Sequence, residues 1–261
     1  MPKFAANLSM LFTEVPFLDR FVEAKKAGFS HVEYLLPYAF PAAELKARLS
    51  ELELKQILFN FPCGDWAAGE RGIASHPNRS DEFRAGVGQA IDYAQCLDTS
   101  HLNVLAGKRV SGSSDEAHWQ TLVENVRYAA QAVARHGMTV LVEAVNHFDV
   151  PGFFLNRVEQ VASLVDEVGE PNVRIQFDVY HVQREEGEVT GTLRKYFPKI
   201  GHIQVADNPG RHQPGTGEIN YRFIFEEIDA LGYPGRIGLE YLPRPDSHAS
   251  LAWLTQYGYA L

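Results

Sequence analysis

The 261-residue chain is 45% hydrophobic and 22% charged, which is the composition of a folded globular protein and excludes disordered and collagen-like classes. Its 24 Lys and Arg residues are outnumbered by 33 Asp and Glu residues, which gives a formal charge of −9 at pH 7. This charge argues against proteins that hold nucleic acid or anionic membranes by general electrostatic attraction. Two cysteines, Cys63 and Cys96, form no metal-binding or redox motif. Without a leader-like or membrane-spanning segment, the sequence predicts a soluble cytoplasmic protein with free thiols.

Short apolar segments alternate along the chain with segments whose apolar residues recur at helical spacing. The expected strands cover residues 3–8, 31–36, 56–60, 101–105, 139–143, 173–178, 200–205 and 236–241. The first expected helix lies between Pro16 and Gly28, the second begins at Pro41, and the others cover residues 81–97, 115–136, 156–168, 190–197 and 221–231.

Strands of this kind, separated by helices, pair in parallel, and eight such units are the number that closes a (β/α)8 TIM barrel. An open doubly wound sheet is the competing architecture, but its usual G-x-G-x-x-G motif is absent after the first strand. No linker divides the chain, so we predict one barrel domain over residues 1–261. Residues 61–80 are too long for a plain connection and are predicted to form an active-site loop.

Four of the later strands end in oxygen-bearing side chains. These are Glu143, Asp178, Gln204 and Glu240, each about one β/α unit from the next. In a barrel the carboxyl ends of the strands share one rim, so these groups are expected to meet. Clustered carboxylates repel unless a cation or a proton neutralises them. Three carboxylates and an amide oxygen are hard donors, which predicts a divalent metal, Mg²⁺ or Mn²⁺.

Several segments resemble the hydroxypyruvate isomerase family, and the match runs nearly from end to end. They are Gly64–Ile73 (GDWAAGERGI), Val142–Gly152 (VEAVNHFDVPG), Gln176–His181 (QFDVYH), Ala206–Arg211 (ADNPGR) and Pro214–Tyr221 (PGTGEINY). The last two blocks are typical of the wider xylose-isomerase-like superfamily, and the first two are more specific. Gln204 stands where ketose epimerases have histidine, and Ala144 departs from the proline of hydroxypyruvate isomerases.

The resemblance implies that the protein interconverts hydroxypyruvate and tartronate semialdehyde through an enediolate, with no redox cofactor. It implies that Glu143, Asp178, Gln204 and Glu240 bind the metal and that Glu143 and Glu240 also carry protons. Charge counting then requires a cation for the carboxylate of a small 2-oxo hydroxy acid. The candidates are Arg211, Lys108 and Arg71, and His181 is expected to face the substrate oxygens. Glu33 is interpreted as a hydrogen-bonded structural acid, with pocket lining as the alternative.

Other functions stay open at this point. A 2-oxo-tetronate isomerase or a ketose 3-epimerase would use the same scaffold. An apurinic endonuclease is disfavoured because it needs several zinc-binding histidines and a basic DNA groove. A non-catalytic sugar-acid sensor is disfavoured because it needs no paired proton carriers. We expect neither nucleic acid nor membrane as a partner, and the sequence leaves open whether the barrel forms a homo-oligomer.

Overall fold

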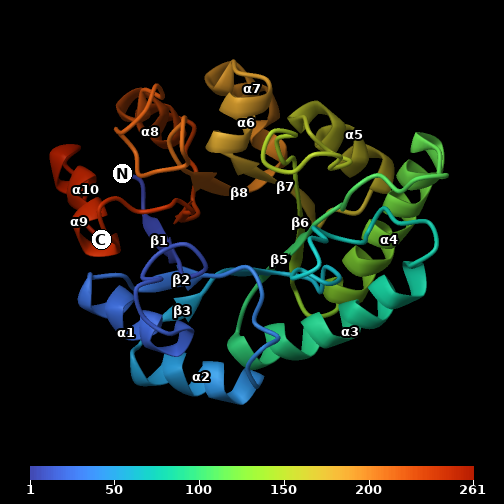
Figure 1. Cartoon of the computed structure of the whole chain (residues 1–261), viewed down its shortest axis with the longest axis horizontal. Helices are drawn as coiled ribbons and strands as arrows, with labels where there is room; N and C mark the ends of the chain where they lie inside the picture. Colours follow the sequence, from blue (N-terminus) through green and yellow to red (C-terminus); the bar gives the residue numbers. More distant parts are fainter.

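The computed structural model covers residues 1–261 and shows a barrel of parallel strands surrounded by helices (Figure 1). The strands are β1 (Phe4–Asn7), β2 (His31–Glu33), β3 (Lys55–Gln56), β4 (Leu58–Asn60), β5 (His101–Val104), β6 (Thr139–Glu143), β7 (Val173–Asp178), β8 (Ile200–Val205) and β9 (Ile237–Leu239). Their order is β3-β2-β1-β9-β8-β7-β6-β5-β4. Only Ile57 separates β3 from β4, so these two segments are halves of one strand and complete the ring. The predicted (β/α)8 barrel is therefore confirmed.

The helices cover the outside of the barrel. They are α1 (Phe17–Lys26), α2 (Ala42–Glu51), α3 (Ser80–Leu97), α4 (Asp115–Ala134), α5 (Val158–Val168), α6 (Val179–Glu185), α7 (Val189–Tyr196), α8 (Tyr221–Ala230), α9 (Ser247–Ser250) and α10 (Ala252–Gln256), with a 3-10 turn at Phe197–Lys199. The seven predicted helices are present with boundaries shifted by a few residues. The sequence analysis did not predict α6, α9 or α10, because helices of four to seven residues are too short to show a helical period.

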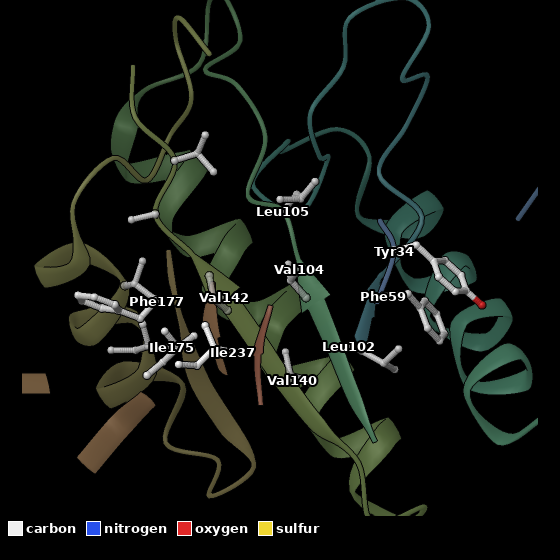
Figure 2. Close-up of a cluster of buried hydrophobic side chains, with 14 of the residues drawn as sticks. Tyr34, Phe59, Leu102, Val104, Leu105, Val140, Val142, Ile175, Phe177 and Ile237 are labelled. Atoms are coloured by element: carbon white, nitrogen blue, oxygen red, sulfur yellow. The ribbon is translucent and has the colours of Figure 1, made fainter. Parts of the chain in front are cut away.

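Alternate residues of each strand face the surrounding helices and form the main hydrophobic core. In β7, Ile175 and Phe177 belong to a buried apolar cluster of 67 residues. Figure 2 shows these side chains together with Leu102, Val140 and Val142 from neighbouring strands. Each fully buried side chain of this size contributes about 1.5–3 kcal/mol to folding. The outward-facing apolar residues of the strands therefore pack against the helices and hold them on the barrel.

The other residues of the strands face the barrel interior, and many of them are polar. The buried polar residues of the strands include Asn7, Glu33, Gln56, Asn60, Asn103, Glu143, Gln176, Asp178, His202 and Gln204. A buried polar group is tolerated only when it is hydrogen-bonded or otherwise compensated. The interior of this barrel is therefore a connected polar network, and its two ends carry different chemistry.

Residues 61–79 connect β4 to α3 without regular secondary structure, as expected for a long loop. Its strongest tie to the barrel is an isolated antiparallel bridge between Gly72 and Ala106. Gly72 has a φ of +112°, and a Cβ there would lie 2.2 Å from the carbonyl oxygen of Leu105. Only glycine permits this close approach, so the loop is held against the chain that follows β5.

A single buried carboxylate organises the loop between β8 and α8. Asp207 Oδ2 accepts hydrogen bonds from the backbone N–H groups of Gly215, Thr216 and Gly217 at 2.8–3.0 Å. Its Oδ1 accepts from the N–H groups of Asn208 and Ile219 at 2.9 and 3.2 Å. Charge-assisted bonds of this kind are stronger than neutral ones, so Asp207 fixes the loop that carries Arg211.

None of the helices is long and apolar enough to cross a bilayer. Both cysteines are free thiols, as predicted, with Cys63 buried and Cys96 partly exposed.

We predict that Asp207→Asn lowers the free energy of unfolding by about 2–4 kcal/mol, because an amide NH₂ would face backbone donors in place of a carboxylate oxygen. Urea unfolding followed by circular dichroism measures this loss. Asp229→Asn, on the exposed side of α8, is the matched control and should change stability by less than about 0.5 kcal/mol. Equal stability of the two variants would contradict the role given to Asp207.

Candidate active site

The four oxygen-bearing residues predicted from the strand ends lie at one end of the barrel. Glu143 and Asp178 are the last residues of β6 and β7, Gln204 is the penultimate residue of β8, and Glu240 follows β9. All four are buried, with exposed fractions between 0 and 6%. Burial at a shared rim gives these groups few ways to contact water, so their charges must be balanced by other residues or by a bound ion.

Two of these residues, Glu143 and Asp178, converge with His181 closely enough to share one ion, whereas Gln204 and Glu240 are not part of this group of three. Ligand atoms of Glu143, Asp178 and His181 all lie within 4.8 Å of one another. His181 Nε2 is 3.6 Å from Asp178 Oδ2 and 3.9 Å from Glu143 Oε1. Asp178 Oδ2 is buried and has no hydrogen-bond donor. An unpartnered buried carboxylate oxygen that faces other ligand atoms fits a divalent cation.

The short helix α6 explains how Asp178 and His181 come together. Asp178 is the residue before α6, and its Oδ1 accepts a hydrogen bond of 2.8 Å from the N–H of Tyr180. One carboxylate oxygen therefore caps the helix, which leaves the other free for the cluster. His181 lies in the first turn, and its Nδ1 is 2.6 Å from Asn146 Nδ2. With Nδ1 engaged in this way, the ring directs Nε2 toward the carboxylates.

Arg211 provides positive charge at the site. Its guanidinium contacts Glu240 and lies 3.5 Å from Asp178 Oδ2, and it stacks 5.2 Å from the ring centre of Tyr180. The backbone of Arg211 adopts a φ of +58°, a conformation that non-glycine residues rarely adopt. The loop that Asp207 organises holds Arg211 in this conformation. Observed strain at a charged residue is typical of functional sites.

The environment shifts the pKa of every carboxyl group in the cluster. Burial raises the pKa of Glu143 well above its usual value, and the charges of Glu240 and Asp178 raise it further. Burial raises the pKa of Glu240 to about 8, although Arg211 opposes the shift. The pKa of Asp178 is also raised by burial and lowered in part by Arg211. Carboxyl groups with raised pKa values can exchange protons near neutral pH.

The two basic groups respond in opposite directions. Burial lowers the pKa of His181 well below its usual value, and Arg211 and Arg184 add to the shift, so the ring is neutral. Burial also acts to lower the pKa of Arg211, but the charges of Glu240, Asp178 and Glu143 outweigh it and raise the pKa. Arg211 is therefore the permanent cation of the site.

A second polar layer supports the cluster from inside the barrel. Glu33 Oε1 accepts hydrogen bonds from Gln204 Nε2 at 2.7 Å and from Asn7 Nδ2 at 3.0 Å. Glu33 Oε2 lies 2.8 Å from His202 Nε2. Gln204 Nε2 and Asn7 Nδ2 also donate to Glu240 Oε2, at 2.5 and 3.2 Å. The interpretation of Glu33 as a hydrogen-bonded acid agrees with this geometry, and Glu33 also positions the amides that contact Glu240.

The other two predicted cations lie on the loop side of the site. Arg71 stacks on Trp66, with its guanidinium 3.9 Å from the ring centre, and donates to the carbonyl oxygens of Trp66 and Glu70. Lys108 is exposed and donates to the carbonyl oxygen of Gly69 at 2.8 Å. Both side chains therefore tie residues of the 61–79 loop together, and neither contacts the carboxylate cluster in this structure.

Sequence reasoning missed the amides that surround the cluster. Asn103 Nδ2 donates to Glu143 Oε2 at 3.4 Å, and Gln176 Nε2 donates to Gln204 Oε1 at 2.6 Å. Asn7 and Asn146 belong to the same set. The available signal was the alternation of apolar and polar residues within β1, β5 and β7, which places these amides on the inner face of the barrel.

Comparison with known proteins assigns the family. A model described as "Xylose isomerase-like TIM barrel" matches residues 21–257. The chain belongs to this family. Hydroxypyruvate isomerase of Escherichia coli strain K12 is 49% identical over 257 residues, covering 98% of this chain and 100% of that protein. The 2-oxo-tetronate isomerase of Cupriavidus necator is 48% identical over 258 residues, covering 98% and 99%. The expected resemblance and the expectation of an isomerase are confirmed within this family.

Two solved structures share the whole fold. A protein described as an AP endonuclease, family 2, from Brucella melitensis superposes with a TM-score of 0.96 at 45% identity, covering 98% of this chain and 99% of that one. D-psicose 3-epimerase from Clostridium cellulolyticum H10 superposes with a TM-score of 0.79 at 18% identity, covering 99% and 100%. The second likeness is one of fold alone.

We predict that Glu33→Gln lowers the melting temperature by about 5 °C or more, because the introduced NH₂ faces donors from Asn7, Gln204 or His202 that the carboxylate now satisfies. Differential scanning calorimetry measures the shift. Glu44→Gln, on the exposed face of α2, is the control and should melt with the unsubstituted protein. If Glu33→Gln melts at the same temperature as this control, Glu33 does not support the site.

Proposed function

We propose that the protein interconverts hydroxypyruvate and tartronate semialdehyde. The observation that carries the proposal is the pair of buried glutamates, Glu143 and Glu240, on strands β6 and β9 of one barrel rim, both with raised pKa values. The names of the relatives support an isomerase acting on a small hydroxy-oxo acid. An isomerase of this kind needs two positioned proton carriers and no redox cofactor.

The reaction balances through an enediolate. One glutamate removes a proton from C3 of hydroxypyruvate, the electron pair of the C3–H bond forms the C2–C3 double bond, and the π electrons of the C2 carbonyl move to the C2 oxygen, which gives the enediolate. The other glutamate delivers a proton to C2, while the proton of the C3 hydroxyl passes to the C2 oxygen and C3 becomes the aldehyde carbon. Each of the two glutamates would act as acid in one direction of the reaction and as base in the other.

We propose that Glu143, Asp178, Gln204 and Glu240 hold a divalent cation, Mg²⁺ or Mn²⁺. The close approach of Glu143 and Asp178, and the buried Asp178 Oδ2 that accepts no hydrogen bond, support these two ligands, and the places of Gln204 and Glu240 at the same rim are the ground for adding them. Oxygen donors of this type suit hard cations. When bound, such an ion supplies Lewis-acid stabilisation of the negative charge that develops on the substrate oxygens.

Arg211 and His181 are the residues that we assign to substrate binding. Arg211 is the cation within the site, and a guanidinium matches the carboxylate of a 2-oxo acid. Neutral His181, with Nδ1 engaged by Asn146, presents Nε2 to the substrate oxygens. Arg71, in the loop of residues 61–80, and Lys108, which contacts that loop through the carbonyl oxygen of Gly69, are the further cations that we assign to the substrate carboxylate.

A 2-oxo-tetronate isomerase is the second candidate, because a relative of that name is 48% identical over 98% of the chain. Its substrate carries one more carbon, and the same carboxylates would move its protons. The apurinic endonuclease function is disfavoured, since the carboxylate cluster includes one histidine and the chain carries a net charge of −9.

Proton NMR in deuterium oxide distinguishes these reactions. The protein is incubated with hydroxypyruvate, with a 2-oxo-tetronate, with a ketohexose and with abasic-site DNA, each with and without Mn²⁺. We expect deuterium exchange at C3 of hydroxypyruvate and formation of tartronate semialdehyde. Turnover of the four-carbon acid with no turnover of hydroxypyruvate would assign the second candidate, and cleavage of the DNA alone would overturn both.

We predict that Glu143→Gln and Glu240→Gln each lower kcat by at least about 100-fold, because a glutamine cannot carry the transferred proton. The KM is expected to change by only a few-fold, because the amide keeps the size of the side chain. Steady-state kinetics measure both quantities, and circular dichroism checks the fold. Glu44→Gln is the control with unchanged kinetics. A kcat for Glu240→Gln near that of the unsubstituted protein would rule out the two-carboxylate scheme.

A further inference from the structure

A second cavity lies at the end of the barrel opposite to the carboxylates. Its volume is about 1050 Å³, which is large enough for a small metabolite. It is lined by the first residues of most strands or the residues just before them: Lys3, His31, Lys55, His101, Thr139, Arg174, Ile200 and Arg236. The cavity is therefore the amino-terminal mouth of the barrel, formed by residues that no step of the proposed reaction uses.

The charges that line this cavity are almost all positive. Its basic residues are Lys3, Lys46, Lys55, Arg174 and Arg236, and its one acidic residue is Asp98. Asp98 forms an ion pair with Lys46. The other four basic side chains have no carboxylate within 4.0 Å, in a chain whose net charge is −9. An excess of unpaired cations around one cavity is unfavourable unless an anion joins them.

Two histidines, His31 and His101, line the cavity beside these cations. Burial lowers the pKa of His31 to about 4, and the charges of Arg236, Lys55 and Lys3 lower it further. His31 and Lys55 are the first residues of β2 and β3, and Lys3 and Arg236 immediately precede β1 and β9. Four strands therefore contribute to this part of the cavity. Burial and the neighbouring His202 likewise lower the pKa of His101 to about 4. At neutral pH these two histidines are uncharged, and the lysines and arginines supply the positive charge of the cavity.

The cavity is separated from the candidate active site by the middle layer of the barrel. His202 lines the cavity, and its Nε2 lies 2.8 Å from Glu33 Oε2. Glu33 in turn accepts from Gln204, which contacts Glu240 at the other end. Glu33 is fully buried and already has three partners, so its charge does not substitute for a ligand in the cavity.

A structural contact accounts for only one of the four cations that lack a carboxylate partner. Basic side chains in the last turn of a helix stabilise the helix dipole. Lys3, Lys55, Arg174 and Arg236 instead belong to strands or to the residues just before them. Arg174 donates to the carbonyl oxygen of Pro198 at 2.8 Å, which orients one guanidinium at the cavity wall.

We propose that the amino-terminal mouth of the barrel is a binding site for a small anion with at least two negative charges, of the class of inorganic phosphate and phosphate monoesters. Arginine and lysine side chains are the donors that recognise phosphate oxygens, and neutral histidines add hydrogen-bond donors. Because the residues of this site are separate from Glu143 and Glu240, the inference does not depend on the proposed reaction.

Isothermal titration calorimetry tests the site with inorganic phosphate, with glycerol 3-phosphate and with sodium chloride at matched ionic strength. We expect one saturable site per chain with a Kd below about 1 mM for at least one phosphate compound at low ionic strength, and no saturable binding of chloride. Tighter binding of glycerol 3-phosphate than of inorganic phosphate would identify a monoester as the ligand, and the reverse order would identify free phosphate.

Matched variants locate the binding site. Lys55→Met and Arg236→Met each remove one charge from the cavity and should weaken binding at least tenfold, whereas Lys195→Met, on the exposed face of α7, should not. Arg211→Met, in the candidate active site, should also leave the Kd unchanged. Lys55 is exposed, so its variant keeps the test decisive if Arg236→Met does not fold. Absence of saturable binding, or loss of binding in Arg211→Met but not in the cavity variants, would overturn the proposal.

Discussion

Three carboxyl groups buried at one end of the barrel need positive charge or protons near them, and the rest of the site follows from this need. Glu143, Asp178 and Glu240 lie on strands whose carboxyl ends point the same way, so the topology brings them together. Burial raises their pKa values, and Arg211 lowers them only in part. A single guanidinium cannot balance three carboxylates, which supports the proposal of a divalent cation at this rim.

Because all strands are parallel, the two ends of the barrel carry different kinds of side chain. Inward-facing residues near the strand starts include His31, His101 and Arg174, whereas those near the strand ends include Glu143, Asp178 and Gln204. Between them, Glu33 links His202 on one side to Gln204 on the other. The apolar residues that alternate with these polar groups face the helices and account for the packing. Stability and chemistry are therefore carried by opposite faces of the same strands.

The fold and the acidic half of the site could be predicted from the sequence because both depend on local pattern. Eight apolar segments separated by helical segments specify the barrel, and the positions of Glu143, Asp178 and Glu240 at strand ends specify the shared rim. Helix α6 could not be predicted, because its seven residues span fewer than two helical turns and show no clear helical period. The residue that caps this helix is Asp178, which is also the last residue of β7. The contact of Arg211 with Glu240 depends on a loop conformation that five bonds to Asp207 establish, and no local pattern specifies such a conformation.

The relatives include isomerases named for a three-carbon acid and for a four-carbon acid. The same proton-carrying carboxylates would serve either reaction. The proposed cation site at the rim is common to both candidate functions. Titration of the protein with Mn²⁺, with free ion counted by electron paramagnetic resonance, tests that feature most directly in the unsubstituted chain and in Asp178→Asn. We expect one ion bound per chain, and an affinity at least about 100-fold weaker in the variant, because its amide removes a negatively charged ligand. Absence of Mn²⁺ binding, or equal affinity in a folded Asp178→Asn protein, would contradict a cation-binding rim.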